Sequence, residues 1–275
     1  MVETRRLCGA LGAEVSGVNL SKPLDEDTAR SVVDAYHEHL VLVFRGQSLD
    51  PAAQIAFTQL FGEPYEHPLR TRANVDGYPE VLIIETRPGR MGARNDYWHS
   101  DISHQECPPA ASILHALEVP DGLGDTMFCN MYRAAETLSP GMQRLLDGME
   151  AMHSGEATMR RAQEKGTDAL RIDSVPPPTA HPILRTHPGT GRRALFVNPH
   201  FTVSFKGMTE EESAPLLDYL AEHSTRPENI YRHRWSVGDV VVWDNRCTMH
   251  YAVRDYDDTV NRKHHRTTAS GERPF

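Results

Sequence analysis

Short apolar runs bounded by turn residues constrain the fold of this chain most strongly. Residues 40–44 are Leu-Val-Leu-Val-Phe and end at Arg45-Gly46, and residues 239–243 contain three consecutive valines before Trp243. Such runs between turn signals are typical of buried strands. Further strands are expected at 80–84, 112–116, 126–129 and 194–198, and helices at 25–40, 50–62, 132–149 and 209–223. The pattern predicts a mainly β fold with helices, a double-stranded β-helix (jelly roll) with helical decorations.

The chain is expected to form one domain over residues 1–275, because it shows no internal repeat, low-complexity tract or long linker. Residues 154–180 are charged and rich in proline. Long loops in compact domains are often functional, so this segment is a candidate lid loop. An insertion without a role is an equally open alternative.

Composition limits the partners that this chain is expected to bind. A formal net charge of -9 argues against a nucleic-acid binder, although local arginines can still attract a small anion. No apolar run approaches the length of a membrane span, and the N-terminus lacks the apolar core of a signal peptide. The four cysteines are scattered without a CxxC pair, which fits reduced thiols. We expect a cytoplasmic protein, a homo-oligomer, that acts on a small molecule.

The segment His99-Ser100-Asp101 places an imidazole and a carboxylate one residue apart. In an extended strand both side chains point to the same face. His250 follows the strand at 239–243, 151 residues after His99 (250 − 99). Two histidines and one carboxylate with open positions form the ligand set of non-haem Fe(II) oxygenases. Zinc is a chemical alternative for the same ligands.

Arg262 lies twelve residues after His250, and Arg266 lies four residues beyond Arg262 (262 − 250; 266 − 262). A metal can be chelated by a 2-oxo acid, whose far carboxylate then needs a cationic partner. A guanidinium meets that need because it pairs bidentately and stays charged. A zinc hydrolase requires no such arginine, so the pair favours an iron oxygenase.

Several motifs in order along the chain carry a family resemblance. They are Leu11 to Leu20, Phe44-Arg45-Gly46-Gln47, Trp98-His99-Ser100-Asp101, Gly124-Asp125-Thr126, Leu195-Phe196-Val197-Asn198 and Trp243-Asp244-Asn245-Arg246. With them the chain resembles, over nearly its whole length, the taurine dioxygenase / aryloxyalkanoate dioxygenase (TauD/TfdA) family of Fe(II)- and 2-oxoglutarate-dependent oxygenases. The resemblance is specific for the family and much less so for a substrate.

The resemblance implies a role for each matching residue. His99, Asp101 and His250 would bind Fe(II). Thr126 would hydrogen-bond the distal carboxylate of 2-oxoglutarate, and Arg262 would form a salt bridge to it. Arg266 would face the substrate anion or support the cosubstrate. The stretch 257–260 is one residue longer than in taurine dioxygenase, which leaves the division of labour between the two arginines open.

The resemblance also implies substrate contacts from His67, Asn95 and Arg266. This chain departs from the family at Arg70, where taurine dioxygenase has a tyrosine, and after His153-Ser154, where an aromatic residue is lost. If Arg70 faces the pocket, it favours a larger or more anionic substrate. If it faces solvent, it has no such meaning.

The implied activity is hydroxylation of a small organic anion, sulfonate-like or carboxylate-bearing, with O2. The reaction is coupled to decarboxylation of 2-oxoglutarate to succinate and CO2. One alternative is a biosynthetic oxygenase that modifies an amino acid or a secondary metabolite. Two others are a non-catalytic jelly-roll binding protein and a zinc hydrolase.

Most of the 15 histidines are expected to be structural. His187 is predicted to support the turn beside its proline. Asp244 is predicted to orient the Asn245-Arg246 turn through hydrogen bonds, since aspartate side chains commonly bond to nearby backbone groups. Neither is expected to bind a metal.

Overall fold

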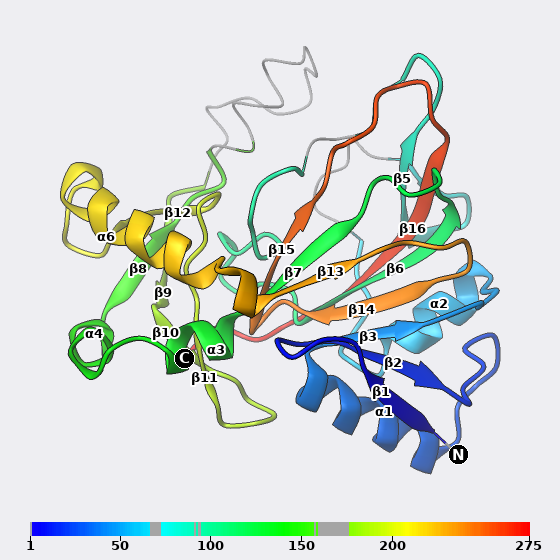
Figure 1. Ribbon diagram of the computed structural model, residues 1–275, viewed down its shortest axis with the longest axis horizontal. Coiled ribbons are helices and arrows are strands. Elements are labelled where there is room, and N and C mark those ends of the chain that lie inside the picture. The colour runs from blue at the N-terminus through cyan, green and yellow to red at the C-terminus, as the bar shows by residue number, and fades with distance from the viewer. Residues whose placement is uncertain (1, 67–72, 91, 93–94, 157, 159–175) are drawn as a thin grey trace.

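The largest element of the computed structural model is an eight-stranded sheet, with α1 beneath one end of it (Figure 1). Residues 2–66, 73–90, 92, 95–156, 158 and 176–275 are described. In sheet order the strands are β1 (Glu3–Arg6), β2 (Ala13–Ser16), β3 (Val41–Phe44), β14 (Val240–Asp244), β6 (Ala111–Glu118), β16 (Arg262–Ala269), β5 (Tyr78–Thr86) and β4 (Asn74–Val75). Among these described strands, β2 and β3 are the one parallel pair.

Smaller sheets and the helices complete the described part of the chain. A three-stranded sheet contains β13 (Ile230–His233), β7 (Thr126–Asn130) and β15 (Thr248–Ala252), and another contains β12 (Thr202–Phe205), β8 (Glu150–His153) and β9 (Thr179–Pro182). Strands β10 (Leu184–Thr186) and β11 (Arg193–Leu195) pair with each other. The α-helices are α1 (Glu26–His39), α2 (Pro51–Thr58), α3 (Met131–Glu136), α4 (Pro140–Leu146) and α6 (Glu210–Ser224), and η2 (Pro227–Asn229) is a short 3-10 helix.

Strand β14 is apolar from Val240 to Trp243 because both of its faces are covered. Its side chains alternate between two hydrophobic clusters, since successive residues of a strand point to opposite faces. Val241 and Trp243 pack in the cluster shared with Phe128 of β7, between the two sheets. Val240 and Val242 pack in the other cluster, on the side covered by α1 and α2. A strand covered on both faces has no polar side to show.

The eight-stranded sheet packs face to face with the sheet of β13, β7 and β15, and helices cover the outer face and the ends (Figure 1). This arrangement confirms the expected jelly-roll core with helical decorations. The predicted strands and helices occur with small shifts of their ends, with two exceptions. The helix expected at 132–149 is wrong: α3 and α4 replace it, because Pro140 occupies the first turn of α4 and Ser139 is its N-cap. The strand expected at 194–198 ends at Leu195.

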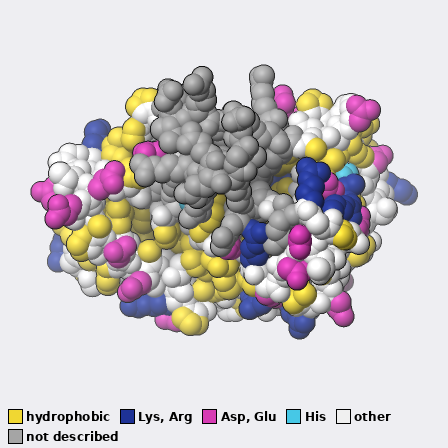
Figure 2. Space-filling view, turned by 90° about the horizontal axis from the view of Figure 1, so that it is seen from above, with side chains coloured by type: hydrophobic (Ala, Val, Ile, Leu, Met, Phe, Trp, Pro, Cys, Tyr) yellow, Lys and Arg dark blue, Asp and Glu magenta, His cyan; other side chains and the backbone are white. Residues whose placement is uncertain are grey.

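The surface seen in Figure 2 carries acidic and basic side chains interspersed among apolar ones. Within the described ranges, no helix is long and apolar enough to cross a membrane. Most of the candidate lid loop, residue 157 and residues 159–175, lies outside the described residues, so its role stays a prediction.

Candidate active site

The three predicted metal ligands meet at one point between the two packed sheets. His250 lies on β15, and His99 forms an isolated antiparallel bridge with it through two backbone hydrogen bonds of 3.1 and 2.8 Å. The Asp101 Oδ1 atom is 3.8 Å from His99 Nε2 and 3.8 Å from His250 Nε2. One ligand atom from each residue lies within 4.8 Å of the others, and all three residues are buried. The spacing fits a single divalent cation held by two imidazoles and one carboxylate.

The local hydrogen bonds prepare these groups to bind a cation. His99 Nδ1 lies 2.9 Å from the Tyr97 carbonyl oxygen, which can only accept, so Nδ1 carries the proton and Nε2 keeps its lone pair. Burial lowers the pKa of His250 well below its usual value, and the adjacent His99 would oppose a second positive charge at this point. His250 is therefore neutral at neutral pH, which is the form that binds a metal.

Asp101 turns its second oxygen, Oδ2, away from the histidines. That oxygen accepts a hydrogen bond of 2.7 Å from the Ser112 hydroxyl and an ion pair of 2.7 Å from Arg266 Nη2. Burial by itself would raise the pKa of Asp101, but Arg266 and the two imidazoles outweigh it and hold the pKa well below its usual range. Asp101 is therefore ionised, with Oδ1 left to face the cation.

The predicted cosubstrate residues lie on strands connected to this centre: Arg262 is on β16 with Arg266, and Thr126 is on β7, which pairs with β15. Arg262 and Arg266 are four residues apart on β16, so their side chains share one face of the strand. Arg262 is 8% exposed, and no carboxylate among the described residues pairs with it. Its Nε atom lies 3.1 Å from where a Cβ on Gly124 would be, two residues before Thr126. A buried guanidinium without a protein anion fits an anionic ligand.

Thr126 is oriented for the same task. Its Oγ1 atom accepts a hydrogen bond of 3.0 Å from Trp235 Nε1. The indole N–H can only donate, so the hydroxyl proton of Thr126 is left to donate to another group. Gly124 stands just before this strand with a φ of 74°, a conformation that glycine adopts without strain.

The predicted substrate residues are only partly placed. The Asn95 side-chain oxygen accepts a hydrogen bond of 3.3 Å from the Tyr97 hydroxyl, and its backbone oxygen binds the Ala252 amide. His67 and Arg70 lie outside the described residues. Arg266 contacts Asp101 directly, and whether it also touches substrate stays a prediction.

A second buried group of potential ligands, His187, Asp244 and Cys247, has the composition of a metal site but not its chemistry. His187 Nδ1 accepts from the amides of Gly189 and Thr190, so its Nε2 carries a proton and donates to Asp244 Oδ2 at 2.9 Å. Burial, followed by the Asp244 charge, raises the pKa of the Cys247 thiol well above its usual value. A metal at this group would have to displace the thiol proton and the Nε2 proton and break the His187–Asp244 hydrogen bond.

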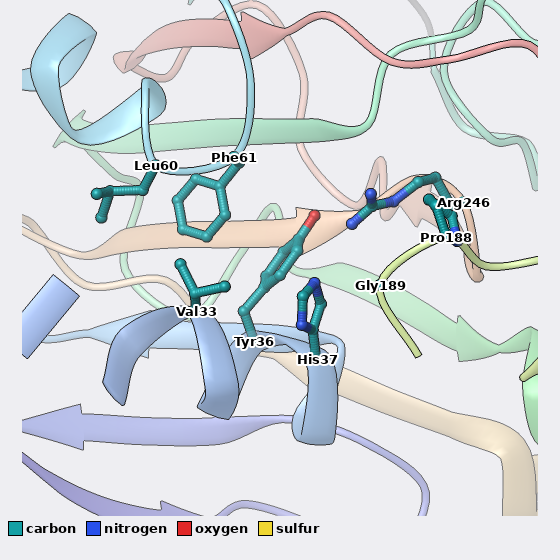
Figure 3. A pocket seen from close by; sticks show the side chains of 8 residues that line it. All are labelled: Val33, Tyr36, His37, Leu60, Phe61, Pro188, Gly189 and Arg246. Atoms are coloured by element: carbon teal, nitrogen blue, oxygen red, sulfur yellow. The ribbon is translucent and has the colours of Figure 1, made fainter. Parts of the chain in front are cut away.

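Asp244 also accepts from the backbone and the guanidinium of Arg246, at 2.7–2.9 Å. The predicted turn-supporting roles of His187 and Asp244 are therefore confirmed. Arg246 points from this turn into a pocket of about 360 Å³, where it meets the polar ends of Tyr36 and His37 (Figure 3). No member of the His99, Asp101 and His250 triad lines that pocket.

Sequence reasoning missed the residues that support the ligands, above all Ser112 and Asn245. Ser112 lies in the otherwise apolar start of β6, and Asn245 follows β14. A polar side chain inside a buried run requires a hydrogen-bond partner. That signal was present at Ser112, but it does not name the partner.

A jelly-roll core that holds two histidines and one carboxylate around an open side is the arrangement of non-haem Fe(II) oxygenases. Comparison with known proteins narrows this class. The profile of the taurine catabolism dioxygenase TauD, TfdA family matches residues 3–268. The chain therefore belongs to the TauD/TfdA family of alpha-ketoglutarate-dependent (2-oxoglutarate-dependent) dioxygenases, and it is an enzyme of that class.

Individual relatives match over nearly the full length. An alkylsulfatase of Acinetobacter baylyi is 37% identical over 278 residues, covering 98% of this chain and 86% of that protein. An alpha-ketoglutarate-dependent sulfate ester dioxygenase of Pseudomonas putida is 38% identical over 281 residues, covering 99% and 91%. The crystal structure of a taurine dioxygenase from Burkholderia xenovorans aligns with a TM-score of 0.84 at 35% identity, covering 99% and 90%.

Proposed function

We propose that this enzyme hydroxylates a small organic anion with Fe(II) held by His99, Asp101 and His250. The observation that carries the proposal is the meeting of three buried ligand atoms from two distant segments within 4.8 Å. The His99 tautomer, the neutral His250 and the ionised Asp101 all suit a divalent cation.

The cosubstrate would bind through the carboxylate that lies far from the metal. Arg262 supplies a buried charge that no described carboxylate neutralises, and Thr126 supplies a hydroxyl proton. A guanidinium and a hydroxyl together suit the two oxygens of one carboxylate. Without a carboxylate partner among the described residues, Arg262 bears a desolvation cost in the cosubstrate-free protein, which binding of the acid would relieve.

When bound, iron and 2-oxoglutarate supply the oxidising chemistry, with O2 consumed and succinate and CO2 released. The residues of the chain bind, orient and exclude water. Asp101 presents one oxygen to the cation because Ser112 and Arg266 hold the other. The buried position of the triad keeps bulk water from the reacting groups.

Among small organic anions, we propose a sulfate ester as the first substrate class to test. The two relatives at 37% and 38% identity are named for sulfate ester chemistry. Sulfonates and carboxylates share the anionic group that Arg266 or Asn95 would contact, so they form the next classes. Amino acids test the biosynthetic alternative.

Anaerobic addition of Fe(II) and then 2-oxoglutarate tests the metal and the cosubstrate together. We expect a metal-to-ligand charge-transfer band in the visible range that appears only with both present, and that His250→Ala abolishes. Metal analysis after anaerobic purification separates iron from zinc. An absent band in a folded, iron-loaded protein would contradict the proposal.

Succinate formation across alkyl sulfates, taurine, aryloxyalkanoates and amino acids then identifies the substrate class. We expect the highest kcat/KM with an alkyl sulfate. Succinate formed equally with and without every compound would show uncoupled turnover and no substrate among them. The predicted homo-oligomer and cytoplasmic location are tested by light scattering and cell fractionation.

A further inference from the structure

The second oxygen of Asp101 stands at the end of a chain of hydrogen bonds that starts at an indole. Trp243 Nε1 donates to Asn245 Oδ1 at 3.0 Å, and Asn245 Nδ2 donates to Ser112 Oγ at 3.0 Å. Ser112 Oγ donates to Asp101 Oδ2 at 2.7 Å. All four side chains are buried.

The two end groups, the Trp243 indole and the Asp101 carboxylate, fix the donor and the acceptor of every hydrogen bond between them. The indole N–H can only donate, which assigns the Asn245 oxygen to Trp243 and the amide NH2 to Ser112. The ionised carboxylate can only accept, so the single Ser112 proton points to Asp101. The Ser112 oxygen accepts from Asn245 and, at 3.0 Å, from Arg266 Nη2. The hydroxyl is thus saturated in one orientation.

Asn245 also binds Ser100, the residue between the proposed ligands His99 and Asp101. The Asn245 backbone oxygen accepts a hydrogen bond of 2.6 Å from the hydroxyl of Ser100, which lies between His99 and Asp101. Asn245 therefore contacts the ligand-bearing segment through its backbone and its side chain. Its own backbone amide is bonded to Ala110 at 2.9 Å, beside β6.

We propose that Trp243, Asn245 and Ser112 form a directed hydrogen-bond relay that holds Asp101 as a one-oxygen ligand. The inference rests on the proposed metal site. With Oδ2 engaged by Ser112 and Arg266, only Oδ1 faces the two histidine Nε2 atoms. A carboxylate that bound through both oxygens would occupy one more position around the cation. The relay thereby keeps open the positions that a chelating cosubstrate and O2 require.

Asn245→Asp tests the direction of the relay with almost no change in shape. An aspartate at this position accepts from Trp243 and also from Ser112, so the Ser112 proton turns away from Asp101. Ser112→Ala removes the same donor by deleting a single oxygen atom. Ser224→Ala is the matched control, because Ser224 is equally buried and donates only to the Leu220 carbonyl oxygen, at 2.7 Å on α6.

The measurement is Mn(II) affinity of the metal-free full chain, followed by the electron paramagnetic resonance signal of free Mn(II). Loss of a group that orients a ligand typically weakens metal binding by about 10–100-fold. We expect that range for Asn245→Asp and Ser112→Ala, and less than about a twofold change for Ser224→Ala. The bound Mn(II) spectrum should also change in the two relay variants, which a purely structural role would leave unaltered.

The results of these measurements distinguish a failure of the proposed relay from a failure of the proposed metal site. Wild-type affinity and an unchanged bound spectrum in a folded Ser112→Ala protein would overturn the relay alone, even if Asn245→Asp failed to fold. An equal loss in Ser224→Ala would also overturn it, because the effect would then be general destabilisation. A wild-type chain that binds no Mn(II) or Fe(II) would overturn the metal site and the relay together.

Discussion

Replacing Arg262 with methionine should shift stability and cosubstrate affinity in opposite directions. The side chain is 8% exposed and has no carboxylate partner among the residues that the structure describes. Burial accordingly lowers the pKa of Arg262, and the interaction with Tyr256 opposes this shift without cancelling it. Methionine is similar in length, apolar and adaptable to an irregular site. Even exchange of a buried ion pair for apolar residues of similar volume is often neutral or stabilising, by about 1–4 kcal/mol, and a buried charge without a carboxylate partner has less attraction to lose.

In the absence of 2-oxoglutarate we therefore expect Arg262→Met to raise the free energy of unfolding by about 1–3 kcal/mol. Affinity for 2-oxoglutarate should fall, because truncating one side of a buried, hydrogen-bonded charge pair costs about 2–5 kcal/mol. That cost corresponds to a dissociation constant raised by roughly 30-fold or more. The same substitution thus makes a more stable protein and a poorer enzyme.

Urea unfolding of the Mn(II)-loaded protein, with and without 2-oxoglutarate, measures both effects at once. The ligand stabilises the wild type according to its concentration relative to the dissociation constant. That increment should disappear in Arg262→Met at the same concentration. Lys263→Met is the matched control: it removes a basic side chain from the opposite face of β16 and should keep the increment.

Two results would refute this reasoning. If Arg262→Met unfolds more easily than wild type without ligand, the guanidinium has a structural partner and is not an uncompensated charge. If its stabilisation by 2-oxoglutarate is unchanged, Arg262 does not hold the distal carboxylate.

Three further predictions concern other groups in and near the site. Asp101→Ala should abolish Mn(II) binding and cost about 3–5 kcal/mol of stability by leaving Arg266 buried without its anion; retained binding in a titration would contradict the ligand role. Thr126→Val should destabilise the fold by about 1–3 kcal/mol, because the Trp235 indole loses its acceptor, and should raise KM for 2-oxoglutarate; an unchanged KM would exclude Thr126 from that site. Burial lowers the pKa of His104 from 6.5 to about 4, so the unfolded chain takes up the proton first. The stability that neutral His104 contributes is complete above pH 6.5 and is lost as the pH falls toward 4, which amounts to about 2 kcal/mol between pH 7 and pH 5. Denaturant unfolding of His104→Gln should therefore show a smaller fall in the free energy of unfolding over that pH range than the wild type. An identical fall would contradict the lowered pKa of His104.

Local chemistry made much of the fold predictable. The runs at 40–44 and 239–243 are strands because β-branched and aromatic residues fit a pleated surface covered on both sides. Asp25, Asp50 and Thr209 begin helices because their side chains accept from exposed backbone amides. The single helix expected at 132–149 is divided because Pro140 starts a new helix.

The sequence predicted which residues form the candidate site, but it did not predict their contacts. His99 and Asp101 were identified by their spacing, and His250, Thr126 and Arg262 by resemblance and by the chemistry of an oxo acid. The ion pair between Arg266 and Asp101 has no signature in the chain, because it joins residues 165 positions apart (266 − 101). The relay through Asn245 was invisible for the same reason.

The sequence by itself determined which segments are strands and helices and which side chains have the chemistry for a metal and a carboxylate. Those properties depend on neighbours one to four residues away, which the chain displays directly. Only the tertiary structure decided which oxygen of Asp101 faces the histidines, which arginine pairs with a carboxylate and which has no carboxylate partner among the described residues. Those choices depend on the register between distant strands and on burial, which raises the cost of every unpaired polar group and forces each to find a specific partner.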